Sequence, residues 1–92
     1  MSDNEFDEAL VVINNEPFSS NKRMLSNHLI NRNYLSLDQV SKVLDVFSFD
    51  SDRLEFAKKA YPKCIDQDRY YLLTNKMSFS SSRTELMEFI NQ

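Results

Sequence analysis

Three basic side chains in this chain follow a repeated phrase at the same offset. The phrase is Phe-x-Ser, found as 18–20, 49–51 and 79–81, and its bases are Lys22, Arg53 and Arg83. A cation in the first turn of a helix opposes the helix dipole by up to about 1 kcal/mol, so its recurrence indicates a contact that outweighs this cost. Two alternatives are open. The bases form ion pairs or cation–π contacts within the chain, or they line one edge and bind an acidic protein segment.

A pair of adjacent tyrosines is the second candidate binding feature. Tyr70 and Tyr71 lie in a segment with helical apolar spacing. Neighbouring helix residues point about 100° apart, so one ring can join the core while the other shows an edge to solvent. An exposed tyrosine is a common interface anchor, so we include Tyr70 and Tyr71 with the three bases as candidate binding residues.

Residue types that carry catalysis or bind metals are scarce. His28 is the only histidine and Cys64 the only cysteine. A catalytic base needs a nucleophile and an orienting group, and neither stands near His28 in the sequence. A structural zinc site needs four ligands, which one Cys and one His cannot supply. We therefore expect no catalytic residue, no metal site and no cofactor.

Two acidic triplets resemble the start of a calcium-binding loop. They are residues 50–52 and 66–68. Such a loop needs Gly at its sixth position and a bidentate Glu at its twelfth. Counted from Asp50 those positions hold Glu55 and Tyr61, and the second triplet fails in the same way. Helix capping explains the same acids, so an EF-hand is rejected.

The elements that position these residues are helical. Six segments have apolar residues at helical spacing, near 6–13, 25–30, 40–47, 54–61, 70–77 and 86–90. The Phe-x-Ser phrases recur about every 30 residues, the length of one helix–turn–helix unit in repeat proteins. The pattern predicts an all-α domain of five or six short helices in three helix–elbow–helix pairs. A compact bundle and a short stacked array are both compatible with it.

Helix starts are predicted from capping residues. The clearest is Ser36 with Gln39, and Ser2 with Glu5 has the same capping-box spacing. The fourth helix is expected to start at Asp50, with Phe49 just outside it, or at Asp52. The remaining expected caps are Asp66 for the fifth helix and Ser82, with Glu85, for the last. Each elbow Phe is expected to fill the corner between its two helices.

Composition limits the possible functions. The chain has 92 residues, a net charge of −3 and no glycine. This length predicts one domain, 1–92, and the missing glycine argues against phosphate-binding loops. Acids outnumber bases and no apolar run is long enough to cross a bilayer, so we expect neither nucleic acid nor membrane as a partner. A single cysteine leaves the redox compartment open.

Several ordered motifs resemble one known family. The run 44–57, the residues Ala60-Tyr61, Ile65-Asp66 and Tyr70-Tyr71, and the closing stretch 79–83 with Leu86 and Ile90 are similar to domain of unknown function 4476. The resemblance covers nearly the whole chain. It implies a small helical domain, found in bacteria and some animals, often as the C-terminal module of a longer protein. It attaches no activity and therefore no functional residue.

Together these observations predict a non-catalytic protein-interaction module that presents a rigid helical surface. The alternative is a structural spacer or C-terminal accessory domain with no binding activity of its own. The resemblance leaves open whether the chain is a whole protein or a domain excised from a longer one. The first case favours a cytoplasmic location and the second, for a bacterial protein, export. Partner and oligomeric state are not determined by the residues.

Overall fold

The computed structural model describes residues 1–92 as an all-α domain. Its elements are α1 (Asp3–Asn14), α2 (Ser19–Arg32), α3 (Leu37–Leu44), α4 (Asp50–Ala60), the 3₁₀ segments η1 (Tyr61–Lys63) and η2 (Gln67–Lys76), and α5 (Ser80–Ile90). It contains no strand, only an isolated bridge between Leu35 and Cys64. The predicted fold class is therefore confirmed.

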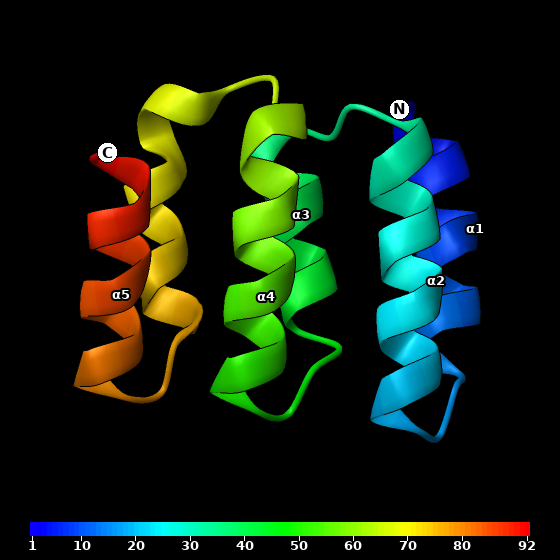
Figure 1. The fold of residues 1–92 in the computed structure, drawn as a ribbon. Helices are drawn as coiled ribbons and strands as arrows, with labels where there is room; N and C mark the ends of the chain where they lie inside the picture. The colour runs from blue at the N-terminus through cyan, green and yellow to red at the C-terminus, as the bar shows by residue number, and fades with distance from the viewer.

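The helices form three pairs that stand side by side in two layers (Figure 1). We call them pair 1 (α1 and α2), pair 2 (α3 and α4) and pair 3 (η2 and α5). One layer contains α1, α3 and η2, and the other contains α2, α4 and α5. The turns within the three pairs all lie at one edge, and the links between pairs lie at the opposite edge (Figure 1). The domain is compact, and within it the three pairs follow one another as a short stack (Figure 1).

The predicted capping box of α3 is complete, and that of α1 forms its serine half. The Ser36 hydroxyl accepts the Gln39 backbone N–H at 3.1 Å, and the Gln39 side chain accepts the Ser36 N–H at 3.0 Å. The hydroxyl of Ser2 likewise accepts the Glu5 N–H, at 3.2 Å. Both motifs satisfy amides that a helix leaves unpaired at its start, using partners three residues apart.

The starts of α2, α4 and α5 correct the sequence prediction. The residue before each of these helices, the N-cap, is Phe18, Phe49 or Phe79, and none makes a side-chain capping hydrogen bond. Asp50 and Asp52 thus lie inside the first turn of α4, not at its cap, and Ser82 lies inside α5. The prediction failed because the two carboxylates bond to neighbouring pairs instead of to their own helix start.

The fifth helix differs from the expected form and cap. It is the 3₁₀ segment η2, which is long for this type of helix. With three residues per turn, Tyr70 and Leu73 fall on one side, and both are buried. Asp66 is its N-cap by position but makes no side-chain capping hydrogen bond, because its carboxylate accepts the Leu37 N–H at 2.7 Å. Asp66 therefore joins the start of α3 to the link before η2.

The core is a single cluster of buried apolar side chains that runs through all three pairs. The elbow phenylalanines are not part of it, so the prediction that they fill the corners is wrong. In pairs 2 and 3 the buried residue of the turn is two positions earlier, at Phe47 and Met77. No helix is long and apolar enough to cross a membrane.

Candidate interaction surface

Three phenylalanines at equivalent positions are exposed at one edge of the stack. Phe18, Phe49 and Phe79 are 66%, 64% and 66% exposed. Each is the last residue of its turn and the N-cap of the following helix, and the three turns lie side by side along the same edge (Figure 1). We call the surface formed by these three residues and the serines beside them the elbow edge.

The neighbours of each elbow Phe along the chain are short and, apart from Pro17, polar. Ser20, Ser51 and Ser81 follow two residues after the Phe and are exposed, and Ser48 and Ser78 precede the second and third Phe and are exposed as well. A large apolar ring among small polar side chains is accessible from several directions. This arrangement is similar to an interface anchor with a polar rim.

The three predicted bases lie just behind this edge and donate hydrogen bonds to backbone carbonyls. Lys22 Nζ contacts the Val46 oxygen at 3.2 Å, in the turn of pair 2. Arg83 Nη1 contacts the Met77 oxygen at 3.0 Å, in the turn of its own pair. No cation–π contact joins a base to an elbow Phe; those present involve Lys58 and Lys63. The bases therefore hold turns in place.

Arg53, the central base, has the most contacts. Its Nε donates to the Leu44 and Phe47 oxygens at 3.3 and 3.0 Å, within the turn of pair 2. Its Nη1 donates to the Lys76 oxygen at 3.1 Å, in pair 3. A planar guanidinium with several fixed donors suits this task better than a lysine ammonium. Arg53 thus connects the turns of two pairs.

Asp50, which is negatively charged, also connects the turns of pairs 2 and 3. Its carboxylate accepts the Ser78 N–H at 2.9 and 3.1 Å and the Phe79 N–H at 2.9 Å, and it pairs with Arg53 at 3.5 Å. Burial raises the pKa of Asp50, but these backbone hydrogen bonds, with the Arg53 charge, outweigh it and lower the pKa below its ordinary value. The carboxylate is held charged at the base of the elbow edge.

The two predicted tyrosines have different environments. The ring of Tyr70 is buried, and its hydroxyl donates to the Ala57 oxygen. Tyr71 is exposed and lines a shallow hollow of about 300 Å³ with Tyr61, Met87 and Ile90. The structure therefore does not bring Tyr70 and Tyr71 together on one surface, and neither lies at the elbow edge.

The remaining reactive side chains are isolated. His28 is exposed. Cys64 is buried and burial raises its thiol pKa, and its Sγ lies 3.6 Å from Asp66 Oδ1. No group of three His, Cys, Asp or Glu side chains is placed to hold a metal ion. These observations identify no constellation beyond the elbow edge and the contacts behind it.

Comparison with protein families gives one match. The family described as Domain of unknown function (DUF4476) matches residues 1–90. The chain belongs to this family. No curated protein and no solved structure matches the chain significantly. Membership of DUF4476 confirms the resemblance noted in the sequence, and it assigns no activity.

Sequence reasoning missed the most exposed aromatic residues of this DUF4476 domain. It counted Phe18, Phe49 and Phe79 as core because large aromatic side chains are usually buried. A signal was present in the neighbours, since each Phe is followed by two small polar residues, whereas buried Phe47 and Phe56 stand beside apolar ones. In pairs 2 and 3 the buried apolar residue of the turn lies two positions before the elbow Phe, at Phe47 and Met77.

Proposed function

We propose that the domain is a non-catalytic protein-interaction module whose contact surface is the elbow edge. The observation that carries the proposal is the equal exposure of Phe18, Phe49 and Phe79 at one edge. Aromatic residues are enriched among the side chains that dominate binding energy, because they bury a large area with few rotatable bonds. A partner with apolar pockets at the spacing of the turns would bind all three.

The position of these rings argues against a role in stability. Ser, Thr, Asp and Asn are the preferred N-cap residues, and replacing one of them by an apolar residue costs about 1 kcal/mol. Each of the three N-caps instead has a Phe without a capping hydrogen bond. Three equivalent helix starts therefore have an N-cap residue that is less stabilising than Ser, Thr, Asp or Asn. This is expected if the phenylalanines serve binding.

The contacts behind the edge support rigid presentation. Asp50 and Arg53 connect the turns of pairs 2 and 3, and Lys22 connects pair 1 to pair 2. Fixed turns keep the rings at set positions, which reduces the ordering cost of binding. Because these bases already donate to carbonyls of the chain, the elbow edge is better supported than a row of bases that bind an acidic segment.

A double substitution tests the proposal. Phe49→Ser with Phe79→Ser removes two rings of the elbow edge and supplies a capping hydroxyl at both positions. Tyr34→Ser with Ile65→Ser is the matched control, because both side chains are exposed and neither lies in a turn within a pair. The three proteins are tagged in cells of the source organism, and co-purified proteins are quantified by mass spectrometry.

The proposal predicts that a partner captured by the native domain is reduced at least about tenfold by the elbow substitutions, equivalent to 1.4 kcal/mol or more. The control should retain it. Equal capture by all three proteins would contradict the proposal. Absence of any specific partner would favour the alternative, a spacer domain. Helicity measured by circular dichroism must be the same in all three, so that unfolding does not explain a loss.

A further inference from the structure

The pairs of this stack are joined by a contact that repeats in register. Lys22, four residues after the first elbow Phe, donates to the oxygen of Val46, three residues before the second. Arg53, four residues after the second Phe, donates to the oxygen of Lys76, three residues before the third. The same position of one pair therefore binds the same carbonyl of the next pair, twice.

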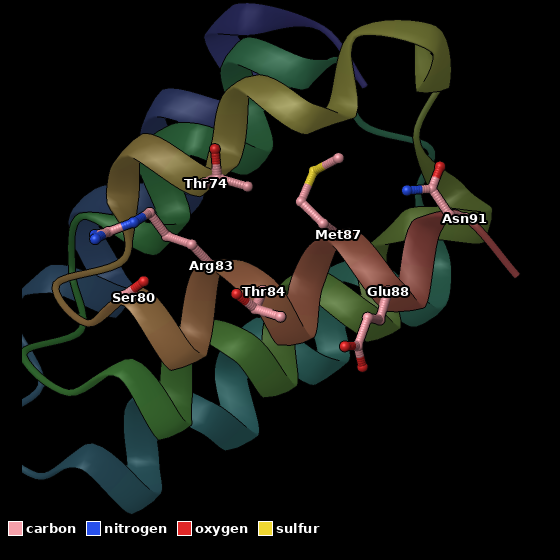
Figure 2. Close-up of a pocket in the computed structure, with 7 residues that line it drawn as sticks. All are labelled: Thr74, Ser80, Arg83, Thr84, Met87, Glu88 and Asn91. Atoms are coloured by element: carbon pink, nitrogen blue, oxygen red, sulfur yellow. The ribbon is translucent and has the colours of Figure 1, made fainter.

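Arg83 occupies this position in pair 3, the last of the three described pairs. It keeps the bond to its own turn, through the Met77 oxygen, as Arg53 does through the Phe47 oxygen. Its side chain also lines a groove of about 520 Å³ on the outer face of α5 and η2, with Thr74, Thr84 and Met87 (Figure 2). The groove lies on the face of pair 3 whose equivalent in pairs 1 and 2 contacts the next pair. We call this face of pair 3 the trailing face.

At the opposite end of the stack, pair 1 exposes apolar residues whose counterparts in pairs 2 and 3 are buried. Val12 lies six residues before its elbow Phe, as do Val43 and Leu73. Val43 and Leu73 are 0% and 2% exposed, whereas Val12 is 56% exposed. Leu25 is only half-buried, whereas its counterparts Phe56 and Leu86 are buried. None of the described pairs covers this outer side of pair 1, which we call the leading face.

We propose that the trailing face of one molecule binds the leading face of a second copy, so that the stack continues from molecule to molecule. In register, Arg83 then donates to the carbonyl of Asn15 in the second copy, three residues before Phe18. Glu16 follows Asn15 in that turn, and no base lies in residues 1–16. The Arg83 guanidinium thus meets the turn that carries the Glu16 carboxylate, which complements its charge.

The other contacts between pairs have compatible counterparts at this junction. Arg23 pairs with Asp52 between pairs 1 and 2, and the same positions at the junction are Thr84 and Asn21. They are neutral and can form a hydrogen bond.

Two further ion pairs join pairs 2 and 3, Lys58 with Glu85 and Lys76 with Asp45. Their counterparts at the junction are Glu88 with Met24, and Asn75 with Asn15. Glu88, the one carboxylate of the trailing groove, therefore meets no second acid.

The junction uses two different faces, so a dimer formed through it still has one trailing and one leading face free. Such a head-to-tail contact can add further copies and gives assemblies whose size increases with concentration until a ring closes. It leaves the elbow edge free and lines up successive edges. The inference is independent of the proposed function, because it depends on Arg83 and the two end faces and not on the exposed phenylalanines.

A charge exchange between the two faces tests the junction. Arg83→Glu places a carboxylate against Glu16 of the next copy, and Glu16→Arg places two guanidinium groups together. Each variant alone should self-associate at least about tenfold more weakly than the native chain. An equal mixture restores opposite charges at every junction, so its association should recover. Sedimentation velocity from low micromolar to near-millimolar concentration measures all four samples.

Three results would overturn the inference: a native chain that stays monomeric throughout, variants that associate as the native chain does, or a mixture that shows no recovery. Arg83→Glu also removes the bond to the Met77 oxygen, so its thermal unfolding is measured in parallel. If it does not fold, Thr84→Arg with Asn21→Arg, which places two cations at the neighbouring junction position, replaces the pair. That variant should also remain monomeric, and its association as the native chain would contradict the junction.

Discussion

The carboxylate of Asp50 accepts the backbone N–H of Ser78 on both oxygens, at 2.9 and 3.1 Å. The two residues belong to different helix pairs and lie far apart in sequence. Asp50 is at the start of α4, and Ser78 is in the turn before α5. Asp50 is of a type that commonly caps its own helix, but here it fixes the turn of the neighbouring pair. The position of the third elbow Phe depends on this bond and on the adjacent one to the Phe79 N–H.

Replacing this carboxylate should destabilise the fold. In Asp50→Asn the side-chain amide loses the negative charge that the two N–H groups and Arg53 contact. Hydrogen bonds to charged groups contribute about 1.5–3 kcal/mol, so we expect the free energy of unfolding in urea to fall by about 2 kcal/mol or more. Asp45→Asn, which removes an exposed ion pair with Lys76, is the control and should cost less than about 1 kcal/mol. Equal losses in both would contradict the role of Asp50.

The same carboxylate should make stability depend on acid pH. The pKa of Asp50 is lowered in the folded domain, while an unfolded Asp has a pKa of about 3.9. A lowered folded pKa adds stability above the unfolded pKa, and this is lost as pH falls through the folded value. The difference in unfolding free energy between the native chain and Asp50→Asn should therefore be constant near neutrality and shrink below about pH 4. A difference that stays unchanged to low pH would exclude this linkage.

The sequence predicts local features of this fold better than contacts between pairs. The Ser36–Gln39 box was predictable because its two partners stand three residues apart. The partners of Asp50 and Arg53 lie in another pair, so sequence spacing indicates an unusual base at Arg53 but not its acceptor. The helical spacing of apolar residues predicts which helix faces are buried. It does not predict whether a Phe in a turn between two helices is buried, because that depends on which residue of the turn faces the core. The residue that does so lies two positions before the expected one, as Phe47 shows.

Tyr70 should contribute to stability at neutral pH and lose its contribution in alkali. Its buried hydroxyl donates to the Ala57 oxygen, so Tyr70→Phe should lower the unfolding free energy by about 1 kcal/mol. Burial raises its pKa above the ordinary value of 10.0, and a raised folded pKa gives stability that is lost as pH rises above the unfolded pKa. The native chain should therefore lose more stability than Tyr70→Phe above about pH 10. Tyr71→Phe, exposed and adjacent, should match the native chain at neutral pH; a loss as large as that of Tyr70→Phe would count against the buried hydrogen bond.

The elbow phenylalanines should be replaceable without loss of stability. Phe18→Ser, Phe49→Ser and Phe79→Ser each place a capping hydroxyl at a helix start that has none, so we expect each to raise the unfolding free energy by about 0.5–1 kcal/mol. Phe47→Ser, at the buried position of the second turn, is the control and should cost about 3 kcal/mol or more. Thermal unfolding followed by circular dichroism separates the two groups. A marked loss at the elbow positions would assign the rings a structural role and weaken the proposed interaction surface.

Ser26 contains the one buried side-chain oxygen that lacks a hydrogen-bond partner. It lies eight residues after its elbow Phe, where pair 2 has the fully buried Ala57, so this position needs a small side chain between neighbouring pairs. Ser26→Ala removes a desolvated hydroxyl and keeps the volume, and we expect it to raise the unfolding free energy by about 1 kcal/mol. Ser26→Leu should instead lower it by about 1–3 kcal/mol, because the added volume pushes α2 away from α4. If Ser26→Ala destabilised the domain, the hydroxyl would have a partner in solution, and the contact between α2 and α4 would need a bound water.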